Sequence, residues 1–568
     1  MGTLAYLVFT GYGAWKWGLA ALLALLCLVR WDRAVARLSA PINRRPWLGI
    51  VLVGIVSFLS VSLLAARRGV PLPYVHDEFS YMLAADTFAR GRLTNPAPPL
   101  AEHFETMHVL VRPTYQSKYP PGQGLSMAAG QLIAGHPIWG IWGVTALACA
   151  ALAWMLLGIV PPRWAMAGGL LAAVHPQILE WGQRYWGGNL AVLGGALFAG
   201  GLLRVMAGRR GAAWMASGMV ILANSRPYEG LVLVLLGLGW LGWHWRFVKA
   251  DVALPSTRRI SGSVALPMLL VLIPAGLWMG YYNWRVTGNP LRLPYQEHHS
   301  QYGHVPLFKF QALSPKPSYT SPELENFYVR DQNYYFVRRN SWSALAREAI
   351  ENVHGLALTL AGNVPSLWVP LLLIPALALK DRRVRALIAI LAAFVCALLI
   401  ETYCYGHYAA PAAGVAAALV ILGLRRLHRG AETSPILLAV GPYLARLAVA
   451  LFVLLSAFWW QGFYNWKQEG FPAQRRQVLT GLNSRPGRHL VIVRYAPDHN
   501  VHDEWVYNEA DIESARVVWA RELNAAAVGR LIERFPDRSV WLLEPDAHPT
   551  QLRPVDGAGA WPVLPLQD

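Results

Sequence analysis

Two adjacent carboxylates, Asp77 and Glu78, stand just beyond a hydrophobic run and have His76 directly before them. A carboxylate held beside apolar surface can have its pKa raised, which suits a general base. Helix capping offers a simpler explanation for Asp77, because Asp is a preferred N-cap and residues 79–89 are expected to be helical. Capping accounts neither for the second acid nor for the histidine. We therefore predict that Asp77 and Glu78 are catalytic.

A cation follows about forty residues later, in the segment Lys118-Tyr119-Pro120-Pro121-Gly122. Prolines and a glycine favour a rigid turn, which would hold the Lys118 ammonium at a fixed depth. Such an ammonium can bind a phosphate group, although a lysine at a span end often does no more than reach toward water. An acid and a cation in one loop suit transfer from a phosphate-activated donor. The carboxylate would take the proton of the acceptor while the cation offsets charge on the departing phosphate.

The composition places these residues in a membrane protein. Of 568 residues, 55% are hydrophobic and 14% are charged, and 25 are tryptophans. Ordinary globular chains carry about 25% charged residues, and apolar runs of about 20 residues match a hydrocarbon core of about 30 Å. The formal charge of +18 does not indicate nucleic-acid binding, because no basic patch is interleaved with aromatic residues. The four cysteines have no CxxC spacing, so neither a disulfide framework nor a thiolate metal site is expected.

About twelve membrane spans are expected from the apolar runs. Their approximate positions are residues 5–29, 47–66, 138–160, 164–179, 188–206, 213–224, 228–246, 264–283, 355–379, 385–402, 408–424 and 436–459. Clusters of Arg and Lys lie between them, near residues 30–45, 204–210, 246–259, 380–385 and 425–429. Short basic loops mark the cytoplasmic side. All five clusters fit one alternation, which places the long loops 67–137 and 284–354 and the C-terminal region outside.

The sequence changes character from about residue 485. β-branched runs at 489–495, 515–520 and 539–544 predict strands, and residues 523–534 predict a helix. This order indicates a small extracytoplasmic α/β domain over 485–568, which should dock on the rest because its own core is small. The predicted fold is thus an all-α polytopic membrane domain over residues 1–460 followed by this C-terminal α/β domain.

The short motifs around these residues resemble those of the GT-C superfamily of membrane glycosyltransferases. The resemblance covers about residues 45–425 and is nearest to dolichyl-phosphate-mannose protein mannosyltransferases and lipid A aminoarabinose transferases. It rests on Asp77-Glu78 after an early span, Lys118 before a Pro-Pro pair, Tyr282-Asn283, Gly288-Asn289-Pro290 and His407-Tyr408-Ala409-Ala410-Pro411. It implies that Asp77 is the base, that Glu78 supports it, and that Lys118 contacts the donor phosphate. The second short outer loop departs from the family pattern, because Arg184 and Asn189 stand where relatives often carry an acid.

Further residues complete the predicted site. We expect four cations to converge with Asp77 on one outer cavity and to bind the donor phosphate: Lys118, Arg112, Arg184 and Arg226. Arg226 could instead only pair with Glu229. The expected cavity or substrate residues are His76, Tyr81, Tyr119, Asn189, Tyr282, Asn289, His407 and Tyr408. Glu297, His298 and His299 are weak metal candidates, because their spacing fits no zinc motif and loop histidines are more often surface groups. No cofactor is predicted with certainty, and a divalent cation is the alternative.

The function expected from the resemblance is that of an inverting glycosyltransferase in the plasma (inner) membrane. It would transfer a sugar from a polyprenyl-phosphate-linked donor to a hydroxyl of a lipid, glycan or protein acceptor on the outer, periplasmic face. A transporter or flippase of lipid-linked sugars is one alternative, although such proteins often show two related halves, and no internal repeat is visible here. A non-catalytic assembly subunit built around the C-terminal domain is the other.

Overall fold

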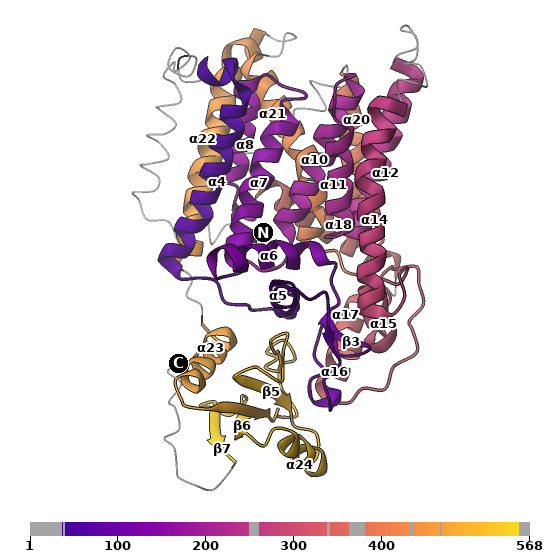
Figure 1. Cartoon of the computed structure of the whole chain (residues 1–568). Helices are drawn as coiled ribbons and strands as arrows, with labels where there is room; N and C mark the ends of the chain where they lie inside the picture. The colour runs from indigo at the N-terminus through magenta and orange to yellow at the C-terminus, as the bar shows by residue number, and fades with distance from the viewer. Residues whose placement is uncertain are drawn as a thin grey trace.

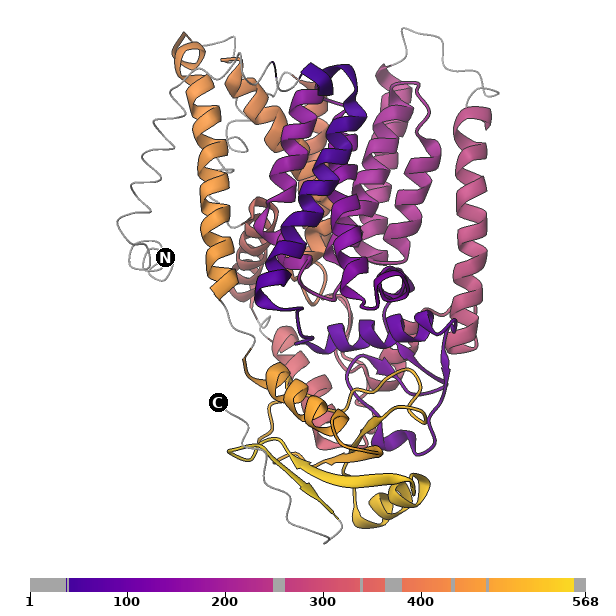
Figure 2. The same ribbon diagram turned by 60° about the vertical axis from the view of Figure 1, so that its left-hand side comes forward.

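A computed structural model describes residues 37, 40–248, 261–337, 341–362, 381–430, 435–465 and 469–555. Helices form an upright bundle, and a small mixed domain lies beyond one end of it (Figures 1 and 2). The expected span at 5–29 and most of the one at 355–379 lie outside the described residues.

Seven helical segments of the described chain are long and apolar enough to cross a membrane. They are Pro46–Arg68 (α4), Ile138–Leu156 (α7), Gly188–Met206 (α10), Pro227–Phe247 (containing α12, Pro227–Trp243), Gly262–Thr287 (containing α14, Leu266–Thr287), Gly406–His428 (containing α21, Ala413–His428) and Pro435–Gly462 (within α22, Pro435–Asn465). The chain is therefore an integral membrane protein, and the predicted polytopic helical domain is confirmed. The predicted count of twelve spans is not confirmed.

Shorter helices occupy several of the other expected spans. They are α8 (Pro162–Ala173), α9 (Pro176–Trp181), α11 (Ala212–Ala223) and α20 (Arg382–Leu398). The 20-residue helix α18 (Trp342–Ala361) lies mostly in the expected loop 284–354, and only its end reaches the expected span 355–379. The predicted span 164–179 is split because Pro176 has no N–H to continue a helix and holds His175 in an extended conformation, with ψ 125°. The helix at the expected span 213–224 is short, because α11 ends at Ala223 and α12 begins only at Pro227.

A close contact between α10 and α11 sets where in the bundle the segment between α11 and α12 lies. A Cβ atom on Gly218 of α11 would lie 2.3 Å from the backbone nitrogen of Phe198 in α10, so only glycine allows the two backbones to approach this closely. Small residues at such contacts are typical of helix pairs in membranes. The segment Asn224-Ser225-Arg226 is thereby held at the end of the bundle that faces the C-terminal domain.

Two helices lie across that end of the bundle in the first long loop (Figure 1): α5 (His76–Ala89) and α6 (Pro121–Ala134). Between them are η1 (Ala101–His103) and an antiparallel sheet of β1 (Asn95–Pro96), β2 (Val109–Leu110) and β3 (Thr114–Ser117), in the order β1-β3-β2. Lys118 follows β3 directly. In the second long loop, α15 (Pro294–Tyr302), α16 (Pro322–Glu325), η4 (Asn326–Asp331) and α17 (Gln332–Val337) cover the same end.

The predicted C-terminal sheet is confirmed. After α23 (Phe471–Asn483) come β4 (Arg488–Val493), β5 (Val517–Arg521), α24 (Ala525–Arg534), β6 (Arg538–Glu544) and β7 (Gln551–Pro554). The sheet order is β5-β4-β6-β7, with β4 parallel to both β5 and β6 and with β7 antiparallel to β6. β4 and β5 are almost fully buried, as expected for parallel strands covered on both faces.

The C-terminal domain shares its hydrophobic core with the first loop. Phe79 and Leu83 of α5 belong to the same buried cluster as Trp505 and Tyr507. The rings of Phe79 and Tyr507 stack with centroids 4.4 Å apart and an interplanar angle of 2°. The predicted docking of this domain is thus a continuous core rather than a surface contact.

Buried charges join the same parts. The Arg521 side chain is 1% exposed and pairs with Glu504, which is also 1% exposed, and with Glu323 of the second loop at 2.9 Å. The backbone oxygen of Arg521 lies 2.8 Å from Nδ1 of His103 in the first loop. Through its guanidinium and its backbone oxygen, Arg521 therefore connects both long loops to the C-terminal sheet.

Replacing Arg521 with Ala should destabilise this junction strongly, because it leaves the Glu504 carboxylate buried without its cation, which costs about 3–5 kcal/mol. Thermal unfolding of the detergent-purified protein would measure the loss. Arg488→Ala is the matched control, since its pair with Asp537 is about half exposed on both sides and such pairs contribute about 1 kcal/mol or less. Equal shifts in the two variants would contradict the assigned role of Arg521.

Candidate functional site

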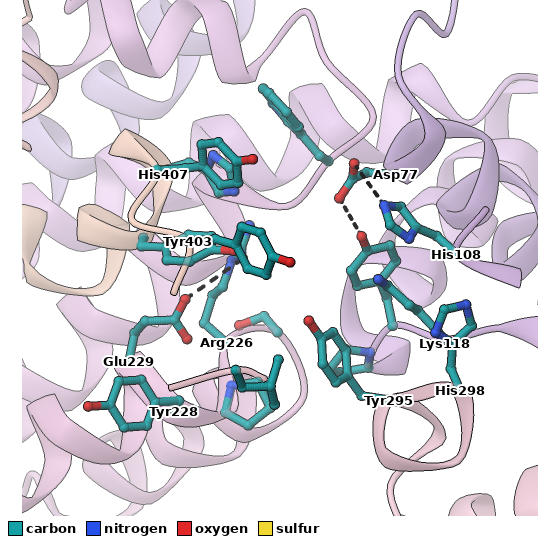
Figure 3. Close-up of a pocket in the computed structure, with 18 of the residues that line it drawn as sticks. Asp77, His108, Lys118, Arg226, Tyr228, Glu229, Tyr295, His298, Tyr403 and His407 are labelled. Atoms are coloured by element: carbon teal, nitrogen blue, oxygen red, sulfur yellow. Dashed lines mark hydrogen bonds and ion pairs between the residues drawn. The ribbon is translucent and has the colours of Figure 1, made fainter. Parts of the chain in front are cut away.

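A cavity of about 900 Å³ lies between the membrane bundle and the C-terminal domain. Its walls come from the start of α5, the segment after β3, the start of α12, α15, η4 and the segment before α21. Figure 3 shows two groups of polar side chains facing each other across it. One group contains Asp77, His108, Lys118 and His298, and the other contains Arg226, Glu229, Tyr403 and His407.

Asp77 lies in the first turn of α5 and opens onto the cavity. Its Oδ1 accepts a hydrogen bond from the Tyr119 hydroxyl, and its Oδ2 lies 3.9 Å from Nε2 of His108. The N-cap is Val75, so capping does not explain Asp77. Its carboxylate is one-third exposed to the cavity and remains free to accept a further proton or hydroxyl.

Glu78 does not line the cavity. Its side chain is fully buried and accepts backbone N–H groups from Tyr74 at 2.7 Å, Val75 at 3.3 Å and Tyr185 at 2.9 Å. Burial raises its pKa, while the Arg184 guanidinium and the three N–H groups oppose that change. Asp77 and Glu78 were both expected to be catalytic. In the structure Asp77 opens onto the cavity, whereas Glu78 holds the backbone in place.

Lys118 is placed by the same helix. The Ser80 hydroxyl on α5 contacts Ser117 Oγ at 2.7 Å and donates to the carbonyl oxygen of His108 at 2.6 Å. That carbonyl also accepts the backbone N–H of Lys118 at 3.2 Å. The Lys118 ammonium lies over the rings of Tyr119 and Tyr295, 5.1 and 4.9 Å from their centroids. Burial lowers the pKa of Lys118 to about 8, although Asp77 acts in the opposite direction.

Arg226 reaches the cavity from the opposite side. Its Nη1 lies 3.8 Å from Glu229, and its guanidinium lies over the ring of Tyr408 at 4.9 Å. Both functions expected for Arg226 are thus compatible, since it pairs with Glu229 and still faces the cavity. Glu401 adds a second acid here, with one buried oxygen that has no hydrogen-bond partner among the described residues. Burial, followed by the charge of Glu229, raises the pKa of Glu401.

Two of the four predicted phosphate cations lie outside the cavity lining. Arg112 does not line the cavity; its side chain is 61% exposed and lies 3.7 Å from Glu102. Arg184 also lies outside the lining. Burial raises the pKa of Glu78 and of Glu180, and the nearby Arg184 guanidinium opposes that rise in each. Only Arg226 and Lys118 share the cavity with Asp77. The expected convergence of all four cations is therefore wrong for Arg112 and Arg184.

Two predicted substrate residues have structural roles instead. The amide nitrogen of Asn189 donates to Thr145 Oγ1 at 2.8 Å and to the carbonyl of Ile178 at 2.9 Å, inside the bundle. Asn289 is exposed in the turn after α14, where its side-chain oxygen accepts the N–H of Leu291. Neither contributes to the cavity lining. The other predicted cavity residues do: His76, Tyr81, Tyr119, Tyr282, His407 and Tyr408.

Histidines gather where the C-terminal domain meets the cavity. Nδ1 of His76 lies 2.8 Å from the Tyr507 hydroxyl, and its ring lies 5.8 Å from those of both His108 and His502. His502 pairs with Asp331 at 3.3 Å. Burial lowers the pKa of His76 to about 4 and that of His108 well below its usual range. Burial thus favours the neutral form of both imidazoles.

The metal candidates are dispersed. Glu297 faces Arg292 at 2.9 Å and lies outside the cavity lining, whereas His298 and His299 line it. Nε2 of His298 is 3.1 Å from the Tyr328 hydroxyl. Within the described ranges, no three His, Cys, Asp or Glu side chains come together in a way that could hold a metal ion.

Sequence reasoning missed several lining residues. His108 is the most consequential, and it takes a left-handed conformation with φ 66° that no local pattern indicates. Tyr295, Asp331 and Tyr403 come from segments without a recognisable motif. His502, from the C-terminal domain, also lines the cavity. Its place in the lining was visible only once the domains were assembled.

No protein-family model matches the chain, and no curated protein matches it by sequence. Solved structures match it in fold. The crystal structure of ArnT from Cupriavidus metallidurans bound to undecaprenyl phosphate aligns with a TM-score of 0.50 and 14% identity over 88% of this chain and 92% of that chain. The chain has a GT-C fold. The family resemblance inferred from the motifs is thereby confirmed at the level of the fold. The Archaeoglobus fulgidus oligosaccharyltransferase tethered to an acceptor peptide aligns with a TM-score of 0.48 and 13% identity, over 88% of this chain and 68% of its own.

The two adjacent acids, Asp77 and Glu78, should differ in their contribution to stability. Glu78→Gln replaces a carboxylate that accepts three N–H groups, and we expect a loss of about 2–3 kcal/mol in stability. Asp77→Asn keeps an oxygen for the Tyr119 hydroxyl and should cost about 1 kcal/mol or less. Thermal unfolding of both variants in the same detergent gives the comparison. A loss for Asp77→Asn as large as that for Glu78→Gln would show that both acids are structural.

Proposed function

We propose that this protein is an inverting glycosyltransferase that uses a polyprenyl-phosphate-linked sugar as donor and a hydroxyl group as acceptor. The observation that carries the proposal is one cavity at the end of the membrane bundle that holds the Asp77 carboxylate together with the cations Lys118 and Arg226. A base beside an anion-binding pair is the minimum that such a transfer needs.

The reaction is a single displacement. The acceptor oxygen attacks the anomeric carbon of the sugar, the bond from that carbon to the phosphate oxygen breaks, and the acceptor proton passes to Asp77. Configuration inverts because the nucleophile enters opposite the leaving group. The departing polyprenyl phosphate takes up negative charge, which Lys118 and Arg226 stabilise. The Tyr119 hydroxyl holds the Asp77 carboxylate in position.

The comparison with ArnT supports a lipid phosphate as the leaving group, since that structure contains undecaprenyl phosphate. Aromatic rings suit the sugar: Tyr403 and Tyr405 stack at 6.3 Å and Tyr405 and His407 at 5.8 Å along one wall of the cavity. Hydroxyl-bearing rings offer apolar faces and hydrogen bonds together.

We place the cavity and the C-terminal domain on the extracytoplasmic side of the inner membrane. The basic ends of the helices support this orientation. Arg67 and Arg68 end α4 on the cavity side, whereas the larger clusters at Arg204, Arg209 and Arg425 lie at the other ends of their helices. Basic segments favour the cytoplasm. A lipid-linked donor is available at the outer surface, where nucleotide sugars are absent.

Asp77→Asn should lower kcat by about 10²–10⁴-fold, the usual effect of removing a general base, and should leave donor binding nearly unchanged. Lys118→Ala should raise the donor KM as well as lower kcat, because it removes a phosphate contact already present in the ground state. Turnover is measured with purified protein, a panel of polyprenyl-phospho-sugars and candidate acceptors. Arg112→Gln is the control variant, because Arg112 is an exposed cation outside the cavity. A fully active Asp77→Asn variant would refute the base assignment.

The pH dependence should identify Lys118. Because its pKa is lowered to about 8, the ammonium is charged below this pH and neutral above it. The value of kcat/KM for the donor should fall about tenfold per pH unit above 8, since this ratio follows the free enzyme. The Lys118→Arg variant remains charged throughout, so its profile should stay level in the same range. A fall that persists in Lys118→Arg would assign the titration to another group.

A further inference from the structure

A second cavity lies at the end of the bundle opposite the Asp77 cavity. It has a volume of about 240 Å³ and forms where α20 begins and α21 ends. Figure 1 shows this end of both helices far from the C-terminal domain. Ile159, just after α7, and Trp240 of α12 complete its walls. The proposed transfer reaction makes no use of this cavity.

Arginines make one side of the cavity positive. Arg383, Arg425, Arg426 and Arg429 line it with a single acid, Asp381. That acid is already engaged: Oδ2 lies 2.6 Å from Nη2 of Arg426, and Oδ1 accepts the backbone N–H of Arg383 at 2.9 Å. Four guanidinium groups against one carboxylate leave three positive charges uncompensated within the lining that the structure describes.

Two of the donors have no acceptor among the residues that the structure describes. Nε of Arg425 and Nη1 of Arg426 are buried, and neither has a hydrogen-bond partner in the described part of the chain. Buried donors without partners are unfavourable, so an anion that accepts from both would stabilise the folded protein. Guanidinium groups bind phosphate oxygens through paired N–H···O bonds. A phosphate group therefore fits this side of the cavity.

The other side is apolar. Ile159, Trp240 and Leu387 line the cavity, and the same three side chains line a narrow crevice of about 30 Å³ that continues into the bundle. Every residue around this crevice is apolar, and they come from α7, α10, α12, α20, α21 and the turn after α7. A basic recess that continues into an apolar crevice matches a ligand that carries both an anionic group and hydrocarbon.

We infer that this cavity binds the phosphate group of an anionic phospholipid. The position of this cavity agrees with a bound phospholipid, because the basic end of the bundle faces the cytoplasmic leaflet under the positive-inside rule. Basic pockets between helices on that side are suited to phospholipid headgroups. The headgroup phosphate accepts hydrogen bonds from Arg425 and Arg426, and the first methylene groups of a chain lie against Trp240 and Leu387. The remaining hydrocarbon extends into the bilayer.

Native mass spectrometry of the delipidated full-length protein, titrated with phosphatidylglycerol, tests this inference. Arg425→Gln combined with Arg429→Gln should weaken binding by about tenfold or more, as expected for lost charge-assisted contacts. The matched control is Arg209→Gln with Arg210→Gln, which removes the same charge from an exposed turn at the same end. This control should bind phosphatidylglycerol as the unmodified protein does. Phosphatidylcholine, which has no net charge, should bind weakly to all three proteins.

Two results would overturn the inference. An equal loss in both double variants would show that phosphatidylglycerol binds to surface charge in general. Displacement of the lipid by millimolar inorganic phosphate would show that the cavity takes a free anion.

Thermal unfolding separates binding from folding, because phosphatidylglycerol should raise the unfolding temperature of the unmodified protein and of the Arg209/Arg210 variant more than that of the Arg425/Arg429 variant. If Arg425→Gln prevents folding, Arg429→Gln alone, at an exposed position, supplies the same comparison.

Discussion

The buried carboxylate of Glu78 ties together two segments that are more than one hundred residues apart in the chain. It accepts N–H groups from Tyr74 and Val75 on one side and from Tyr185 on the other. Successive residues of a helix point about 100° apart, so turning Glu78 into the protein turns Asp77 toward the cavity. The position of the proposed base thus depends on a carboxylate that does not touch the cavity.

The remaining surface of α5 is fixed from other directions. Ser80 sets the segment that leads to Lys118, and Phe79 stacks on Tyr507 of the C-terminal domain. Farther along, Oδ2 of Asp86 accepts the backbone N–H of Ala510 at 2.8 Å. One short helix is therefore bound by the membrane bundle, by its own loop and by the C-terminal domain. Asp77 and Lys118 keep their relative positions because both are held by contacts of α5.

The sequence predicted those features that depend on local pattern. Apolar runs indicated the helices, β-branched runs indicated the C-terminal strands, and the turn-forming residues after Lys118 indicated a fixed cation. It could not separate Asp77 from Glu78, because adjacent acids look alike until the helix is packed. It also grouped Arg112 with Lys118, although one faces solvent and the other the cavity. His108 and His502 depend on a left-handed residue and on contact between distant segments, and neither condition leaves a local signal.

The core shared by the first loop and the C-terminal domain has a consequence for biogenesis. Phe79, Leu83 and Phe104 leave the ribosome some four hundred residues before Trp505 and Tyr507, which cover them. During that interval the loop presents these apolar side chains without their partners, and contacts so distant in sequence form slowly. The cavity can therefore mature only after Trp505 and Tyr507 have been synthesised. A truncated chain would insert its helices in the membrane and still lack the site.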